Sequence, residues 1–227
     1  MLIRSTSNAF RSYLSSFCIV CFLLLSPCAT AQITHASQGR LDENATEALR
    51  KAASRFNQNV AFTVTATSFS SEKKLLSKQT AQVRYHKGKY RLSLPDQELI
   101  SDGTTLWHWN KQASEVAISN VSTDDVDFLN PASLLTNYPQ LFKPKYIRTD
   151  ADGTAVIDLQ PHSARNFHKL RLFIREEDGL LLRIEVHKFD SSRELYEISD
   201  FKRAATPASQ FTFTPADHPS VEVIDMR

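Results

Sequence analysis

Cysteine is absent from most of this chain. The 227 residues include three cysteines, Cys18, Cys21 and Cys28, and all of them precede residue 32. Residues 32–227 can therefore form no disulfide bond and offer no thiolate to a metal ion. Glycine is also scarce, with 5 residues, and none belongs to a G-x-G-x-x-G motif, a P-loop or a G-x-S-x-G nucleophile elbow.

An excess of charge of one sign is missing as well. The chain has 27 basic and 25 acidic residues, and Arg4 and Arg11 are the only charged residues before residue 32. Residues 32–227 therefore carry 25 charges of each sign. A neutral chain lacks the basic footprint of a nucleic-acid-binding protein, so we expect no nucleic-acid partner.

The start of the chain has the pattern of a secretory signal peptide. The two early arginines supply the basic start, residues 17–25 the apolar run, and Ala29-Thr30-Ala31 the small residues of a cleavage site. The apolar run is shorter than the roughly 20 residues that a membrane-spanning helix needs. We therefore expect residues 1–31 to be removed on secretion and residues 32–227 to form a single domain.

Both tryptophans fall in one predicted hairpin. Residues 99–109, L-I-S-D-G-T-T-L-W-H-W, read as two strands joined at Asp102-Gly103, because glycine accepts the positive φ of a tight hairpin turn. Side chains alternate along a strand, so Trp107 and Trp109 project to the same face. Such a surface packs into an ordinary core, which is the commoner case, or lines a site for an apolar ligand.

Two helices are predicted. The first begins after Asn44, which has the spacing of a capping box with Glu47, and ends near residues 57–59. The second covers residues 132–138 and follows Asn130-Pro131, an N-cap with proline at the first helical position. The apolar stripe of the first helix has four members, Leu49, Ala52, Ala53 and Phe56.

Elsewhere apolar and polar residues alternate with a period of two, the pattern of strands with one buried face. We expect about eleven or twelve antiparallel strands, which makes the fold mainly β with helices. A sheet of that size curls or closes, and both helices are expected to cover its concave side. The expected strands are 62–67, 80–86, 90–94, the two arms of 99–109, 115–119, 142–147, 155–159, 169–174, 180–187, 195–201 and 211–213, with a last edge segment at 221–224.

No arrangement of side chains points to catalysis. His162 and His168 have a spacing that matches no common zinc site. Residues 176–178, E-E-D, precede Gly179 and read as a solvated turn. We therefore expect no enzyme activity, no metal and no cofactor.

Four stretches carry a family resemblance. Residues 101–107, S-D-G-T-T-L-W, match a hairpin of pattern S-D-G-x-T-L-W, and residues 130–135, N-P-A-S-L-L, match a helix in mid-chain. Residues 211–215, F-T-F-T-P, match an F-x-F-x-P segment, and residues 219–225 match a closing segment. In this order the stretches are similar to the periplasmic outer-membrane lipoprotein carrier family, LolA.

The resemblance implies a curved, unclosed antiparallel β-barrel of about eleven strands under a helical lid. It implies a monomer that takes acylated lipoproteins from an inner-membrane ABC transporter and hands them to an outer-membrane acceptor or to the outer membrane itself. The family often has an arginine that holds the lid closed. Lys87 stands at that position, before Tyr90, and lysine lacks the forked guanidinium group of such a latch.

We expect the acyl chains to lie in an apolar cavity between the sheet and the lid. Hiding a chain of about fifteen methylenes from water is worth roughly 12 kcal/mol. Apolar contacts and a lid that opens would let a carrier hold this cargo and release it. The residues predicted to line the cavity are Phe62, Val64, Val83, Tyr85, Tyr90, Leu92, Trp107 and Trp109 in the sheet, with Leu134 and Leu135 in the lid.

Three alternatives remain. A related domain would use the same fold and cavity to sense mislocalised lipoproteins or to bind glycolipid. A secreted hydrolase would use His187 and Asp190 as an acid–base pair, although no nucleophile is placed beside them. A structural β-domain would bind proteins through an edge strand.

We expect the exported protein to begin at Gln32, and intact-mass spectrometry measures this directly. A mass that retains residues before Gln32 would contradict cleavage after Ala31. A lipid anchor on Cys28 is disfavoured, because Pro27 stands where such a signal needs a small residue. That anchor would add the mass of acyl chains to the product.

Overall fold

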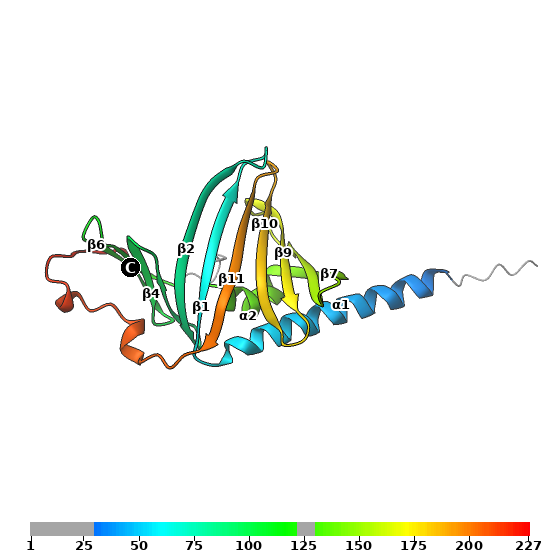
Figure 1. Ribbon diagram of the computed structural model, residues 1–227, viewed down its shortest axis with the longest axis horizontal. Helices are drawn as coiled ribbons and strands as arrows, with labels where there is room; N and C mark the ends of the chain where they lie inside the picture. The colour runs from blue at the N-terminus through cyan, green and yellow to red at the C-terminus, as the bar shows by residue number, and fades with distance from the viewer. Residues whose placement is uncertain (1–29, 122–129) are drawn as a thin grey trace, which may run out of the picture.

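Figure 1 shows the computed structural model, which describes residues 30–121 and 130–227, with side chains described from residue 42 onward. One bent sheet contains the twelve strands of these residues, in the order β12-β6-β5-β4-β3-β2-β1-β11-β10-β9-β8-β7. The strands are β1 (Val60–Phe69), β2 (Leu75–His86), β3 (Lys89–Ser93), β4 (Gln97–Ser101), β5 (Thr105–Asn110), β6 (Glu115–Asn120), β7 (Phe142–Thr149), β8 (Thr154–Pro161), β9 (Phe167–Arg175), β10 (Leu180–Lys188), β11 (Arg193–Arg203) and β12 (Glu222–Asp225).

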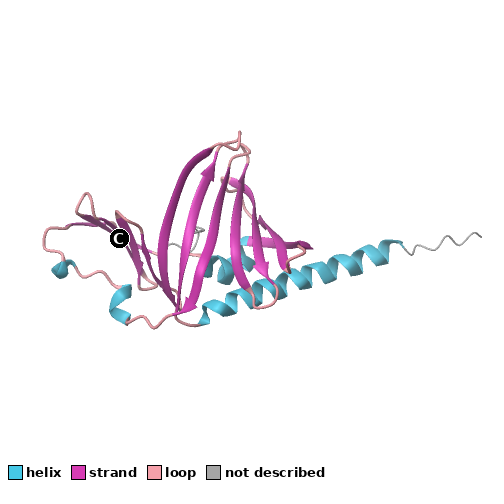
Figure 2. Cartoon of the chain, viewed as in Figure 1, coloured by secondary structure: helices cyan, strands magenta, loops and turns pink. Residues whose placement is uncertain are grey.

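The sheet is curved and does not close. Its edges are β12 and β7, and neighbouring strands run antiparallel except β12 and β6, which run parallel. Figure 2 shows the helix α1 (Thr30–Ser54) lying across one end of the central strands, and α2 (Pro131–Leu141) packs against α1 and β7. The predicted fold class, a curved unclosed sheet with a helical cover, is confirmed.

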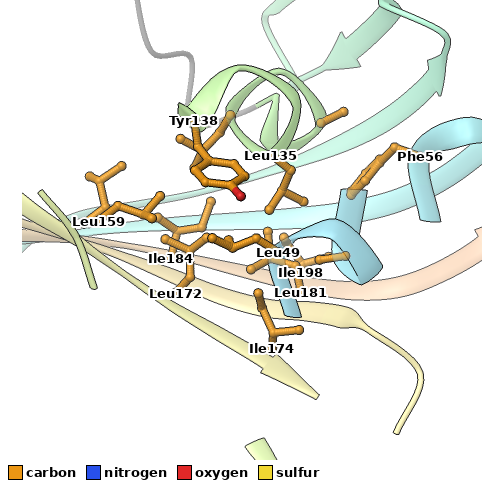
Figure 3. Close-up of a cluster of buried hydrophobic side chains, with 14 of the residues drawn as sticks. Leu49, Phe56, Leu135, Tyr138, Leu159, Leu172, Ile174, Leu181, Ile184 and Ile198 are labelled. Atoms are coloured by element: carbon orange, nitrogen blue, oxygen red, sulfur yellow. The ribbon is translucent and has the colours of Figure 1, made fainter. Parts of the chain in front are cut away.

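Alternation along the strands gives the sheet two faces. The face that packs against α1 and α2 is termed the inner face here, and the opposite one the outer face. The strand register places Ile157, Leu172, Ile184 and Tyr196 in one row across β8, β9, β10 and β11 on the inner face. Figure 3 shows part of the resulting cluster, in which Leu49, Leu135 and Tyr138 of the helices meet Leu159, Leu172, Ile174, Leu181, Ile184 and Ile198 of the sheet.

Helix α1 starts earlier than the sequence predicts. The helix begins at Thr30, so Asn44 lies inside it and is not its N-cap. The carboxylate of Glu47 instead pairs with the guanidinium of Arg50, one turn away, at 2.6 Å. Residues 32–43 contain no proline, so nothing in them forces the helix to end. The predicted apolar stripe is buried, with Leu49 and Ala52 at 0% exposure and Phe56 at 5% in the following 3₁₀ turn, η1 (Arg55–Asn57).

Helix α2 begins as predicted and runs longer. The side chain of Asn130 accepts a hydrogen bond from the backbone N–H of Ser133 at 3.3 Å, and Pro131 takes the first turn. The helix continues through Pro139 to Leu141, where it ends within one turn. In the part of the chain that the structure describes, neither helix has the length and apolar character needed to cross a bilayer.

The predicted hairpin of residues 99–109 forms as β4 and β5. The backbone N–H of Asp102 donates to the carbonyl of Thr105 at 3.3 Å, so Gly103 and Thr104 are the central residues of the turn. Gly103 has a φ of +95°, which side chains disfavour. The carboxylate of Asp102 accepts from the backbone N–H groups of Thr105 and Thr104, and these bonds lower the pKa of Asp102.

The C-terminal segment corrects one predicted strand. Residues 204–221, termed the strap, cross the outer face of β4, β5 and β6. The expected strand 211–213 does not form, because Phe211 ends the 3₁₀ helix η2 (Ala208–Phe211) and Pro215–Asp217 form another, η3. Their backbone hydrogen bonds are local, as from the N–H of Gln210 to the carbonyl of Pro207 at 3.0 Å. The expected last edge segment is confirmed as β12.

Candidate functional site

Six of the predicted cavity residues share the inner face of three neighbouring strands. Phe62 of β1 lies opposite Val83 of β2, and Val83 lies opposite Leu92 of β3. Tyr85 and Tyr90 form the next pair, and Val64 lies opposite Ala81. All of these side chains are buried, with exposures from 0% to 7%. The structure therefore brings these six residues together as one apolar surface.

The predicted lid residues pack against the same cluster. Leu134 and Leu135 of α2 are each 2% exposed and belong to the inner cluster. Phe56 of η1 stands edge-on to the rings of Phe62 and Tyr85, with centroids 5.8 Å and 5.7 Å away. In this conformation the helices themselves fill part of the space over the inner face. The sequence prediction missed Leu49 and Phe56 as part of this surface, although both belong to the apolar stripe of the first helix.

The two tryptophans lie elsewhere. Trp107 pairs with Ile100 and Trp109 with Glu98, on the outer face, and the inner positions of this hairpin belong to Leu99, Leu106 and His108. The expectation that the tryptophans share a surface with Phe62 and Leu92 does not match this register. Leu92 pairs with Leu99, and Leu99 pairs with His108. The two short turns before β4 and β5 set this register, so these turns decide which face the tryptophans occupy.

A second hydrophobic cluster surrounds the tryptophans. Its buried members are Ile100, Trp107, Val116, Ile118 and Phe213. The ring of Phe213, from the strap, lies 5.4 Å from Trp109, and His218 lies 4.4 Å from the same ring. The strap therefore covers the tryptophans as α1 and α2 cover the inner face.

A cavity lies where the cover meets the sheet. Its volume is about 540 Å³, and Lys87 stands on its rim. Lys87 is in the turn between β2 and β3 with a φ of +47°, and no ion pair or hydrogen bond of its ammonium group is found among the described residues. The lining comes from η1, the β2–β3 turn and α2: Ala53, Phe56, Asn57, Tyr85, Lys87, Gly88, Asn130, Ser133, Thr136 and Asn137.

Comparison with known proteins places this arrangement in a family. The family model described as "Outer membrane lipoprotein carrier protein LolA" matches residues 47–214. The chain belongs to the LolA family.

Its curated relatives in the LolA family are distant. The outer-membrane lipoprotein carrier protein of Edwardsiella ictaluri is 30% identical over 136 residues, which is 59% of this chain and 63% of that protein. The carrier protein of Pectobacterium carotovorum subsp. carotovorum is 30% identical over 128 residues, 56% of this chain and 61% of that protein. The matched segments thus span less than two thirds of these relatives.

A solved structure shares the fold. The crystal structure of an uncharacterized conserved protein from Thermus thermophilus superposes with a TM-score of 0.57 at 14% sequence identity. The match covers 80% of this chain and 99% of that chain. At this identity the likeness concerns the fold alone.

In this LolA-family chain, polar contacts fasten α1 at the β9–β10 turn. The ammonium group of Lys51 donates to the backbone carbonyls of Glu176 and Glu177, the latter at 2.7 Å. Gly179 permits this approach, because a Cβ atom there would lie 2.7 Å from the Cγ atom of Lys51. In the same turn, the guanidinium of Arg175 donates two hydrogen bonds of 2.9 Å to the carboxylate of Asp178.

The candidate catalytic and metal-binding residues do not form a site. His187 lies 3.3 Å from the carboxylate of Glu185, whereas the carboxylate of Asp190 accepts from the backbone and hydroxyl of Ser192. The proposed His187–Asp190 pair is therefore not assembled. No group of three or more His, Cys, Asp or Glu side chains that could hold a metal ion occurs among the described residues.

We expect the Asp178 contact to make stability sensitive to acid. Two hydrogen bonds from Arg175 lower the pKa of Asp178 from 3.8 to about 2 in the folded chain. Because the folded pKa is the lower one, the ionised carboxylate stabilises the fold above about pH 4, and this stabilisation is lost as the pH falls toward 2. Urea unfolding from pH 7 to pH 2 should show that Asp178→Asn is less stable at neutral pH and has a flatter acid limb. Asp96→Asn, in an exposed turn, is the control, and an equal effect there would contradict the assignment.

We expect tryptophan emission to report the strap. Phe213→Ala removes a ring that is 5% exposed and shields Trp109, so water should reach the indole and shift the emission to the red. An acyl ligand on the inner face should leave the emission of the unaltered protein unchanged. Phe189→Ala, at a side chain that is 72% exposed, is the matched control. A large change on ligand addition would place the ligand against the tryptophans instead.

Proposed function

We propose that this chain is a periplasmic carrier that binds the acyl chains of lipoproteins between the inner face and the helical cover, and transports them from the inner to the outer membrane. The observation that carries this proposal is the continuous apolar inner face under two helices, in a chain of the LolA family. The task needs no covalent chemistry, since burial of hydrocarbon supplies the binding energy.

Loading exchanges one set of apolar contacts for another. The helices occupy part of the space over the inner face, with Leu134 and Leu135 buried against it, so an acyl chain that enters there displaces part of the cover. The methylenes of the cargo then replace the contacts that these side chains gave up. The net gain is smaller than the full roughly 12 kcal/mol of moving about fifteen methylenes out of water. A cargo held with this smaller net gain can be released to an acceptor.

The helix α2 is the part of the cover that opens in this proposal. In the part of the chain that the structure describes, the side-chain hydrogen bonds of α2 stay within the helix and its cap, as from Thr136 to the carbonyl of Ala132 at 2.9 Å. Helix α1 is fastened by Lys51 at the β9–β10 turn. Lys87, on the rim of the cavity beside α2, forms no comparable contact among the described residues.

The partners follow from this role. An inner-membrane ABC transporter would load the carrier, and an outer-membrane acceptor or the outer membrane itself would receive the lipoprotein. The predicted signal peptide would bring the carrier to the periplasm as a monomer, with residues 1–29 lying outside the described residues. Two relatives that bear the name outer-membrane lipoprotein carrier protein support a lipoprotein as the cargo.

A pair of variants on one strand tests the binding site. Val64 is 1% exposed on the inner face, and its neighbour Thr65 points to the outer face. Val64→Gln should weaken binding of an acylated lipopeptide by about tenfold, because the amide would meet acyl chain without a hydrogen-bond partner. Thr65→Gln should bind like the unaltered protein. Binding is measured by displacement of a fluorescent fatty acid, after thermal unfolding has shown that both variants fold.

The same pair tests the transport role in cells. Depletion of the protein should leave outer-membrane lipoproteins in the inner membrane, and the Thr65→Gln variant should restore their sorting better than Val64→Gln. Membrane fractionation followed by detection of the lipoproteins gives this result. Equal binding by the two variants would show that the cargo does not bind at the inner face. Normal sorting after depletion would overturn the transport role.

A further inference from the structure

A second cavity lies beside the end of α1 and is rich in basic side chains. It has a volume of about 420 Å³, and its lining includes the end of α1, the first residue of β1 and the last residues of β11. These ends of α1, β1 and β11 lie close together in Figure 1. Four basic residues and one acidic residue contribute to its wall. The complete lining is Lys51, Ser54, Arg55, Gln58, Val60, Asp178, Phe201, Lys202 and Arg203.

The one carboxylate of this cavity is already saturated. Asp178 accepts two hydrogen bonds from Arg175 at 2.9 Å, one from the backbone N–H of Leu180 at 3.1 Å and one from Nη2 of Arg55 at 3.3 Å. An ionised carboxylate offers about four lone-pair positions, and these bonds use them. Asp178 is therefore engaged with Arg175 and Arg55 and does not neutralise the other cations of the cavity.

Those other cations have no acidic partner in the described part of the chain. Lys51 donates to the carbonyls of Glu176 and Glu177, which are neutral acceptors, and forms no ion pair within 4.0 Å with a described carboxylate. Lys202 and Arg203 are exposed at the end of β11 and form no ion pair with a described residue. The cavity thus concentrates positive charge in a concave wall, which strengthens the attraction for an anion.

The floor of the cavity is apolar. The guanidinium of Arg55 lies 5.3 Å over the ring of Phe201, and Phe201 stacks on Phe62 with centroids 5.8 Å apart. Phe56 stands edge-on to Phe201 at 5.5 Å. The contact with the Phe201 ring stabilises the guanidinium of Arg55 in this position, and its Nη1 group donates to no acceptor among the described residues. A preorganised guanidinium and flexible lysines are the donors that phosphate oxygens favour.

We infer that this cavity, lined by Lys51, Arg55, Lys202 and Arg203, binds a phosphate group. The phosphate belongs to an anionic phospholipid headgroup or is free in solution, and the two sources share the same chemistry. The basic wall of this cavity contains none of the residues predicted to bind acyl chains, although Val60 and Phe201 of its lining also belong to the inner cluster. The inference rests on the basic wall and therefore does not depend on the acyl-binding proposal.

The test uses the mature chain and two double variants of equal charge change. Lys202→Gln with Arg203→Gln removes two cations from the cavity, whereas Lys143→Gln with Lys145→Gln removes two cations from the edge strand β7. Binding of inorganic phosphate is followed by NMR chemical shifts. The cavity variant should weaken this binding by about tenfold or more, because charge-assisted hydrogen bonds are lost, and the β7 variant should match the unaltered protein.

Vesicles distinguish the two sources of phosphate. Co-sedimentation compares vesicles of phosphatidylglycerol with vesicles of phosphatidylcholine, for all three proteins, with and without added inorganic phosphate. Selective binding to phosphatidylglycerol that is lost in the cavity variant and competed by phosphate assigns a lipid headgroup. Phosphate binding without vesicle binding assigns the free anion. Equal losses in the two double variants, or no binding of either probe, would overturn the inference.

Discussion

The alternation of side chains across one continuous sheet is the constraint on which the structure depends. Twelve strands in a single sheet must agree on which residues face the helices, because a slip of one residue moves a whole strand's apolar set to the other face. The row Ile157, Leu172, Ile184 and Tyr196 shows this agreement over four strands. The curvature then wraps that apolar face around α1 and α2, so that one surface serves as core and as candidate binding surface.

Among the described residues, no α-helix covers the outer face, and two different features make it compatible with water. On β8, β9 and β10 it is charged: the carboxylate of Asp158 accepts from Arg171 at 2.6 Å and from Lys169 at 3.1 Å. Burial raises the pKa of Asp158, but the hydrogen bonds from Arg171 and Lys169 outweigh it and hold the pKa below its usual value. On β4, β5 and β6 the outer face is apolar and is covered by the strap, whose Phe213 packs against Trp109.

Sequence patterns predicted the features that depend on neighbouring residues in the chain. Period-two alternation and turn signals located all twelve strands, and Asn130-Pro131 located the start of α2, because each signal lies within a few residues of the structure it specifies. The faces of Trp107 and Trp109 depended instead on the register set by two successive turns, and the strand expected at 211–213 depended on where the strap crosses the sheet. The early start of α1 at Thr30 was not predicted, and residues 32–43 contain no proline that would have ended the helix. The phosphate-binding cavity gathers residues from α1, β11 and the β9–β10 turn, which no sequence spacing connects.

In the described part of the chain, polar contacts hold the helical cover to the sheet at the β9–β10 turn but not at the β2–β3 turn, and this difference matters for a carrier. At the β9–β10 turn, Lys51 reaches two backbone carbonyls, and Gly179 leaves room for it, so this end of α1 is tied by charge-assisted hydrogen bonds. At the β2–β3 turn, Lys87 faces a cavity lined by neutral groups of α2. A cover tied at both ends would resist the entry of cargo, and one tied at neither would expose the apolar inner face to water. A cover tied at one end keeps the core of the sheet dry while leaving α2, held by apolar contacts, as the part whose displacement costs no buried ion pair.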